Sequence, residues 1–360
     1  MNNNLQGILK HFNVALTPNA YGNGHINDTY LIKTNPGYIL QKINTNVFHD
    51  PVSVMENIKR VTDHLRLKIT AAGGNPDRET LTVIDTVDGK PFYKDEGGNY
   101  YRMYIFIEGA RSYDIVENPM QLYNAAKAFG NFQMMLSDFP ADELHEVIPN
   151  FHNTVSRYTD FKRAVADNLS GRADTCRNEI DFVLSREPDA SVVVDDIASG
   201  KIPLRVTHND TKLNNVLLDE TTGEGVCVID LDTVMPGSLL YDFGDALRFG
   251  GSSGAEDEPD LGKIWFDLEK FEYFTRGFLE TLDTITTHEL ELLPFSVKLM
   301  TLECGSRFLA DYLNGDTYFK THYPEHNLVR ARTQFKLVSD IETKHDRMME
   351  IVQNIYHSKR

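Results

Sequence analysis

The spacing of hydrophobic and polar residues changes about a third of the way along the chain. A short helix is predicted at residues 5–13, and strand-like alternation follows at 21–32, 38–43, 82–86 and 100–107. Beyond these strands the period is helical, over residues 120–135, 159–169, 176–184, 268–282, 292–313 and 327–355. We therefore predict an α+β fold with two lobes. A small antiparallel β-rich lobe spans residues 1–107, a larger helical lobe spans 108–360, and a hinge lies near 106–111.

One helix interrupts the β-rich region, at residues 50–67. Asp50 directly precedes Pro51, which is the pattern of an N-cap followed by a proline in the first helical turn. Apolar residues then recur at helical spacing and predict one buried stripe, made of Val54, Ile58, Val61 and Leu65.

The composition suits one large or two modest globular domains, because 41% of the 360 residues are hydrophobic and 25% are charged. No run of about 18 apolar residues occurs, so we expect no transmembrane helix. The first residues lack the basic and apolar regions of a signal peptide. We expect a cytoplasmic protein, in which Cys176, Cys227 and Cys304 are reduced thiols.

The net charge of −17 argues against nucleic acid as a partner. It also means that local cations and Mg²⁺ would have to attract any anionic nucleotide. The densest acidic run, at residues 256–260, is interpreted as a solvated loop rather than a metal site.

The strongest chemical signal is His208-x-Asp210 followed by Asn215, with Asp230 and Asp232 directly after a short β-rich run. This order is typical of the catalytic core of protein kinases and their small-molecule relatives. In that core, Asp210 receives the proton of the acceptor hydroxyl, and Asn215 and Asp230 hold Mg²⁺ on the nucleotide phosphates. Each residue alone could equally cap a turn, but the joint spacing favours catalysis. Further along, Asp242 and Asp245 are predicted to brace the catalytic loop.

The predicted nucleotide site lies in the β-rich lobe. The run Gly22, Asn23 and Gly24 predicts a turn whose backbone N–H groups can approach phosphates, although an ordinary hairpin has the same pattern. Phe106, at the predicted hinge, is assigned to the same site. Because strand side chains alternate, Gln41 takes the inward position that a lysine occupies in kinases, and Lys42 faces the other way. A register slip of one residue would reverse the two.

Two further charged residues bear on the missing lysine. Lys212, two residues after the catalytic aspartate, is placed to supply positive charge near the phosphates, and its alternative is a surface lysine in a loop. Glu56 could pair with a strand lysine, but a solvated partnership with Lys59 at i, i+3 is favoured.

Several runs of the sequence resemble the aminoglycoside-phosphotransferase and choline-kinase-like superfamily, whose fold is protein-kinase-like. The similarity extends over nearly the whole chain to the N-acetylhexosamine 1-kinases of bifidobacteria, through residues 21–27, 205–215, 229–238, 242–245, 303–313 and 323–329. This resemblance implies ATP- and Mg²⁺-dependent phosphorylation of the anomeric hydroxyl of N-acetylglucosamine or N-acetylgalactosamine. It carries the role of base to Asp210 and the role of metal ligands to Asn215 and Asp230.

Four residues are candidates for binding the sugar: His25, Asp232, Arg307 and Tyr318. A hexosamine needs a set of donors and acceptors around its ring, because a mispaired polar group costs roughly 1–3 kcal/mol. Each candidate has an alternative. His25 could be structural, Asp232 could bind a second metal or cap a turn, and Tyr318 could belong to the core. Arg307 could pair with Glu303 or Asp311 on its own helix.

Two other functions stay open at this point. The first is a kinase for another small alcohol such as choline, homoserine or an aminoglycoside, since a cationic acceptor would suit the acidic chain. The second is a non-catalytic nucleotide-binding module, which the missing strand lysine suggests and the intact Asp210, Asn215 and Asp230 oppose. The expected partners are ATP and a sugar, without nucleic acid or membrane, and the oligomeric state is open.

Overall fold

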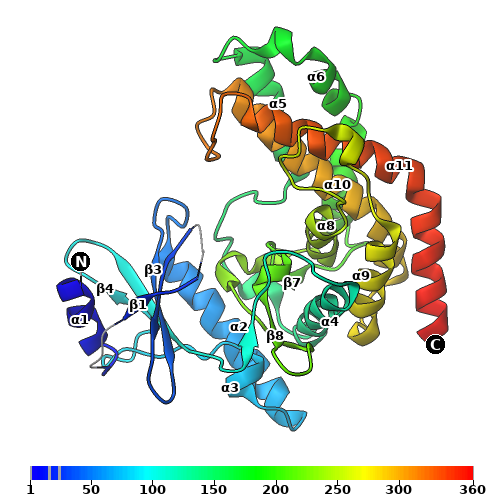
Figure 1. Ribbon diagram of the computed structural model, residues 1–360. Coiled ribbons are helices and arrows are strands. Elements are labelled where there is room, and N and C mark those ends of the chain that lie inside the picture. The colour runs from blue at the N-terminus through cyan, green and yellow to red at the C-terminus, as the bar shows by residue number, and fades with distance from the viewer. Residues whose placement is uncertain (1, 15–17, 23–25, 360) are drawn as a thin grey trace.

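The computed structural model describes residues 2–14, 18–22 and 26–359 and has two lobes (Figure 1). In the N-terminal lobe an antiparallel sheet has the strand order β1-β2-β3-β5-β4. Its strands are β1 (Asn19–Ala20), β2 (Asp28–Ile32), β3 (Tyr38–Ile43), β4 (Tyr93–Lys94) and β5 (Tyr100–Ile105). Helix α1 (Asn2–Lys10) lies on one face of this sheet, and α2 (Pro51–Ala71) packs on the other. The strand predicted at residues 82–86 is wrong, because Val83 makes only an isolated bridge to Tyr104.

Helix α2 begins as its sequence predicts. The Asp50 carboxylate accepts the backbone N–H groups of Val52 and Ser53, and Pro51 is the first helical residue. The predicted apolar stripe is buried, with Val54, Ile58, Val61 and Leu65 at most 2% exposed. The helix runs to Ala71, one turn beyond the predicted end.

Strand β3 presents alternate residues to the two faces of the sheet. Leu40 packs in the cluster that holds α1, whereas Ile39 and Ile43 pack in the cluster that holds α2. Gln41 shares the second face and bonds to Arg102 on β5. The predicted register is therefore confirmed: Gln41 points inward and Lys42 takes the opposite face.

The segment predicted as a hinge joins two different sheets. Strand β5 ends at Ile105, and β6 (Ala110–Arg111) pairs with β8 (Val216–Asp219), which in turn pairs with β9 (Gly225–Val228). A third, two-stranded sheet is formed by β7 (Arg205–Thr207) and β10 (Met235–Gly237). The bending of residues 106–111 stays a prediction.

The C-terminal lobe is built of helices around α10 (Figure 1). The helices of the chain from residue 76 onward are α3 (Pro76–Glu79), α4 (Pro119–Met135), α5 (Thr154–Asp167), α6 (Arg177–Leu184), α7 (Val192–Ala198), α8 (Leu239–Gly250), α9 (Leu268–Thr281), α10 (Thr287–Leu313) and α11 (His326–Lys359). Sequence periodicity did not predict α7 or α8. Eleven of the twelve residues of α8 are buried, and these include the charged residues Asp242, Asp245 and Arg248.

The helices, the cysteines and the acidic run differ in how far their surroundings follow from composition. Within the described ranges no helix is long and apolar enough to cross a membrane. Cys176 and Cys227 are buried thiols, and Cys304 is half-buried. The acidic run at 256–260 is a loop, but it is not simply solvated, because Glu256 pairs with Arg248 at 2.8 Å and Asp257 contacts His326 at 3.1 Å.

Candidate active site

The loop between β7 and β8 carries the predicted catalytic residues. Side chains of α8 bond to its backbone. The carboxylate of Asp242 accepts the backbone N–H groups of His208 at 3.0 Å and Asn209 at 2.7 Å. Asp245, one turn later, accepts the N–H of Thr211 at 3.2 Å. The prediction that Asp242 and Asp245 brace this loop is confirmed. Burial raises the pKa of Asp242, although the backbone N–H groups oppose the shift.

The same loop is tied to the strand that leads to Asp230. His208 Nε2 contacts the carbonyl oxygen of Ile229 at 2.8 Å, and Thr233 Oγ1 donates to the carbonyl of His208 at 2.7 Å. Asn209 adopts a positive φ of 64° and donates through Nδ2 to the carbonyl of Thr233. The two stretches that carry the predicted proton acceptor and the predicted metal ligand are therefore bonded to each other.

Asp210 lies between the two other predicted residues of its loop. Lys212 Nζ contacts Asp210 Oδ1 at 2.8 Å. Asn215 Nδ2 donates to Asp210 Oδ2 at 3.1 Å and to the Asp210 carbonyl at 2.7 Å. Because Nδ2 makes both of these bonds, the Oδ1 atom of Asn215 is left for a cation.

Asp230 stands at the end of β9 in a left-handed conformation, with φ 59° and ψ 56°. The N–H of Ile229 donates to the carbonyl of Asn215 at 2.9 Å, which brings the two predicted metal ligands side by side. The residue as a whole is exposed, while neighbouring atoms partly remove its carboxylate from water. This desolvation, together with the charges of Asp232 and Asp210, raises the pKa of Asp230 to about 6.

These residues fit a divalent cation. Three carboxylates crowd one another, and a cation would relieve their repulsion. Among the residues that the structure describes, no group of three or more His, Cys, Asp or Glu side chains is arranged as a metal site. Asp230 with Asn215 is instead the partial set typical of Mg²⁺, which is usually held by one or two carboxylates and completed by phosphate and water.

Asp232 turns toward the N-terminal lobe. Its Oδ1 pairs with Arg102 Nη1, and its Oδ2 accepts from Asn27 Nδ2 at 2.7 Å. It does not line the pocket that holds Arg307 and Tyr318. Arg102 was missed in the sequence, although one arginine within the apolar run of β5 signals a charge that needs a partner.

The predicted nucleotide face is described in part. Gly22 has a φ of 75°, a conformation that favours glycine, and the preceding Tyr21 sets its ring edge-on to Phe106 at 5.8 Å between centroids. The N–H of Phe106 donates to the carbonyl of Gly37. These contacts place the turn at Gly22 next to the start of the segment between the lobes. Asn23, Gly24 and His25 lie outside the described residues.

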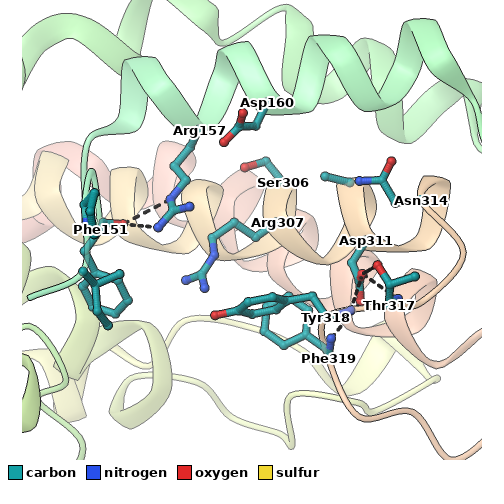
Figure 2. Close-up of a pocket in the computed structure, with 13 residues that line it drawn as sticks. Phe151, Arg157, Asp160, Ser306, Arg307, Asp311, Asn314, Thr317, Tyr318 and Phe319 are labelled. Atoms are coloured by element: carbon teal, nitrogen blue, oxygen red, sulfur yellow. Dashed lines mark hydrogen bonds between the residues drawn. The ribbon is translucent and has the colours of Figure 1, made fainter. Parts of the chain in front are cut away.

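A pocket of about 290 Å³ opens between α5, α10 and the residues after α10 (Figure 2). Its walls hold Arg307 and Tyr318, two of the predicted sugar contacts. The guanidinium of Arg307 lies among three rings, 5.9 Å from Phe151, 5.8 Å from Tyr318 and 5.5 Å from Phe319. Figure 2 shows it pointing into the space between Phe151 and Tyr318.

The alternatives for Arg307 are wrong, since both carboxylates have other partners. Glu303 contacts His152 Nδ1 at 3.0 Å. Asp311 accepts the backbone N–H groups of Tyr318 at 2.8 Å and Phe319 at 2.9 Å, and so fixes one wall of the pocket. No carboxylate of the described chain lies within ion-pair distance of Arg307.

The interpretation of Glu56 also needs correction. Its carboxylate contacts His145 Nε2 at 2.7 Å, and Lys59 pairs instead with Asp63. Lys59 therefore pairs with the carboxylate at i, i+4 and not with Glu56. The partner of Glu56 lies 89 residues away in the sequence.

His152 joins the pocket to the catalytic loop. Its Nδ1 contacts Glu303, one helical turn before Arg307, and its Nε2 contacts the carbonyl of Asn209, the residue before Asp210. Phe151, the preceding residue, lines the pocket. His152 thus connects a residue next to the pocket wall with the residue that precedes Asp210.

Comparison with protein families identifies the class. Residues 18–274, more than half of the chain, match the phosphotransferase enzyme family (APH). The chain therefore belongs to this family of phosphotransferases.

Solved structures with the same fold include three kinases of different substrates. The microcompartment-associated aminopropanol kinase is 16% identical with a TM-score of 0.62, over 96% of this chain and 98% of that chain. A spectinomycin phosphotransferase in complex with ADP and spectinomycin is 16% identical with a TM-score of 0.55, over 96% and 98%. A choline kinase from Cryptosporidium parvum is 14% identical with a TM-score of 0.51, over 94% and 90%. These similarities confirm the predicted two-lobe, protein-kinase-like fold.

Proposed function

We propose that the protein uses ATP and Mg²⁺ to phosphorylate the anomeric hydroxyl of an N-acetylhexosamine and so forms the sugar 1-phosphate. Membership of the phosphotransferase family supports the kinase chemistry. The acceptor is supported by the pocket around Arg307, and by the resemblance of the helix segment 303–313 to N-acetylhexosamine 1-kinases.

The observation that carries the acceptor assignment is the charge of this pocket. Arg157 and Arg307 line it together, and their charges are close enough to interact. The two carboxylates in its walls are engaged, Asp160 with Arg163 and Asp311 with backbone N–H groups. A cationic acceptor such as choline or an aminoglycoside would meet repulsion here. A neutral sugar with acetamido and hydroxyl oxygens would meet the free donors of Arg307 and the faces of aromatic rings.

The residues of the catalytic loop would act as follows. Asp210 accepts the proton of the anomeric hydroxyl, which is more acidic than an ordinary sugar hydroxyl and therefore suits a carboxylate base. Lys212 and Asn215 hold the two oxygens of Asp210 in place. Asp230 and the Oδ1 atom of Asn215 would hold Mg²⁺, which neutralises charge on the phosphates when bound.

The nucleotide would lie along the N-terminal lobe. Gly22, Asn23 and Gly24 are proposed to cover the phosphates, with Gln41 on the inner face of β3 and Phe106 at the segment between the lobes. Lys212 is proposed as a cation for the phosphates, which it could reach by exchanging its bond with Asp210.

A panel of acceptors tests this proposal. ADP release is measured at fixed ATP and Mg²⁺ with N-acetylglucosamine, N-acetylgalactosamine, the parent hexoses, choline and homoserine. We expect an N-acetylhexosamine to give the highest kcat/KM and choline to give none above background. If choline or homoserine outcompetes every hexosamine, the protein is a kinase for another small alcohol. ATP binding without turnover on any acceptor would favour a non-catalytic module.

A further inference from the structure

A buried arginine lies where a protein kinase presents its strand lysine. Arg102 occupies the middle of β5 directly opposite Gln41 of β3, and its side chain is 1% exposed. Gln41 Oε1 accepts from Arg102 Nε at 2.9 Å. The inward positions of the two neighbouring strands thus bring together a neutral amide and a guanidinium, at the place where kinases hold the phosphate-binding lysine of β3.

Both oxygens of the Asp232 carboxylate contact residues of the N-terminal lobe. Arg102 Nη1 pairs with one of its oxygens, and Asn27 Nδ2 donates to the other at 2.7 Å. Asn27 is itself fixed, because its Oδ1 accepts the backbone N–H of Asn44 at 3.0 Å. Asp232 follows the predicted metal ligand Asp230 by two residues, so these contacts tie the metal-binding turn to the sheet.

The backbone conformation of the turn at Asp230 requires such a stabilising contact. Asp230 has a φ of 59°, and a residue other than glycine persists in this conformation only where its surroundings fix it. Thr233 anchors one end of the turn to the carbonyl of His208. Asp232, in the middle of the turn, anchors it to β5 through Arg102.

Helix α2 does not supply the usual partner for a cation at this place. In protein kinases a glutamate of the corresponding helix pairs with the strand lysine. Here Met55 faces the guanidinium, with its Sδ 3.9 Å from Arg102 Nη1, and Glu56 turns away to His145. Compared with protein kinases, the cation of the ion pair is therefore on β5 instead of β3, and the carboxylate is on the metal-binding turn instead of α2.

We propose that Arg102 is a positioning residue for phosphoryl transfer, which holds the Asp230 turn through Asp232 and brings fixed positive charge to the site in place of the strand lysine. The inference rests on the proposed function only for its metal and nucleotide, and is independent of the acceptor. Without Arg102, Asp232 would be a buried carboxylate that has lost its cation, and the turn would leave the conformation that presents Asp230.

Manganese binding tests this role without any acceptor. The Kd of Mn²⁺ is measured by electron paramagnetic resonance in the presence of a non-hydrolysable ATP analogue. We expect Arg102→Met to weaken Mn²⁺ binding about tenfold or more, as is typical when a residue that orients a metal ligand is removed. Lys42→Met is the matched control, because it removes a cation from the other face of the adjacent strand, and it should leave the Kd unchanged. Wild-type Mn²⁺ affinity in Arg102→Met would overturn the proposal.

Two further variants separate positioning from general damage to the fold. Gln41→Lys added to Arg102→Met restores a cation from β3 and should recover part of the lost affinity. The second variant combines Asp232→Asn with Arg102→Met. Its loss of Mn²⁺ affinity should be no greater than that of the larger single change, since both residues act through one contact. Fully additive losses would show that Arg102 does not act through Asp232. If Arg102→Met does not fold, Arg102→Lys serves in its place and should show an intermediate loss, whereas a wild-type Kd would contradict the role of the guanidinium.

The outcome is distinguishable from that of the proposed function. A wild-type protein that binds Mn²⁺ with the analogue but phosphorylates no hexosamine would remove the acceptor assignment and leave the role of Arg102 to be decided by the variants. A wild-type protein that binds no Mn²⁺ with the analogue would overturn both proposals.

Discussion

Asp210 has two neighbours that determine its chemistry, Lys212 on one carboxylate oxygen and Asn215 on the other. These contacts orient the carboxylate and keep it close to positive charge. The sequence could predict this group, because all three residues belong to one loop and their spacing fixes their proximity. It could not predict Arg102 with Asp232, since the two are 130 residues apart and meet only when the lobes pack together.

Replacing Asp210 with asparagine removes the proposed proton acceptor while keeping the size of the side chain and one of the two oxygens that contact Lys212 and Asn215. We expect Asp210→Asn to lower kcat at least about a hundredfold, in line with the loss of a general base. The Kd of ATP should change little, because Asn215 and Asp230 remain. Turnover near the wild-type value in the purified variant would remove Asp210 from the mechanism.

Arg307 lines the pocket proposed for the acceptor and makes no ion pair with a carboxylate of the described chain, so its loss should affect one substrate only. We expect Arg307→Ala to raise the KM for the sugar about tenfold or more, as the loss of a hydrogen bond to a charged group implies, with the KM for ATP nearly unchanged. Saturation curves for both substrates measure this. Equal effects on the two KM values would show that Arg307 acts on the fold rather than on the acceptor.

At the scale of elements, periodicity predicted the helices that have one buried and one exposed face, such as α2 and α4. It did not predict α8, whose surface is buried nearly all round, and α8 is the helix that supplies Asp242 and Asp245. The bracing role of these two residues was predicted, whereas the helix that carries them became apparent only from the structure.

The packing of α4 against α9 depends on glycines that bring the two backbones close together. A Cβ atom added at Gly277 would collide with the carbonyl oxygen of Tyr123, and one added at Gly130 would collide with that of Phe278. We expect Gly277→Ala to destabilise the protein by about 1–3 kcal/mol, the usual range for overpacking. Denaturant unfolding measures the loss.

The control for Gly277→Ala is Gly171→Ala, at an exposed turn where an added Cβ meets nothing within 4 Å, although its φ of 70° disfavours alanine. This variant should lose less stability than Gly277→Ala. The kcat of folded Gly277→Ala should stay near that of the wild type. If the two variants are equally stable, the backbones of α4 and α9 leave room for a Cβ atom at residue 277.

At the scale of the molecule, the two lobes and their order were predictable, because the change from alternating to helical spacing is strong. The pocket walls were not, because they combine α5, α10 and the turn held by Asp311. His152 joins these parts to the catalytic loop. Burial of its ring lowers the pKa of His152, but the charge and hydrogen bond of Glu303, with a contribution from Asp245, outweigh burial and raise the pKa above its usual value of 6.5.

This shift makes stability depend on pH. Since the folded protein holds the proton of His152 more tightly than the unfolded chain, the contribution of this pair is fully present below about pH 6.5 and is lost as pH rises through the folded pKa. The free energy of unfolding, measured in urea, should be higher for the wild type than for Glu303→Gln. We expect this difference to be larger at pH 5.5 than at pH 8.5. A difference that grows with pH would mean that His152 is neutral in the folded protein.

The central claim is that the protein phosphorylates an N-acetylhexosamine at its anomeric oxygen, and phosphorus NMR of the product tests it most directly. Purified protein is incubated with ATP, Mg²⁺ and N-acetylglucosamine or N-acetylgalactosamine, and the new phosphate signal is assigned by its coupling to the sugar protons. The account predicts coupling to the anomeric proton, which identifies the 1-phosphate, and no such signal with Asp210→Asn on the same time scale. A 6-phosphate, coupled to the two protons on carbon 6, would contradict the account and leave only the kinase assignment.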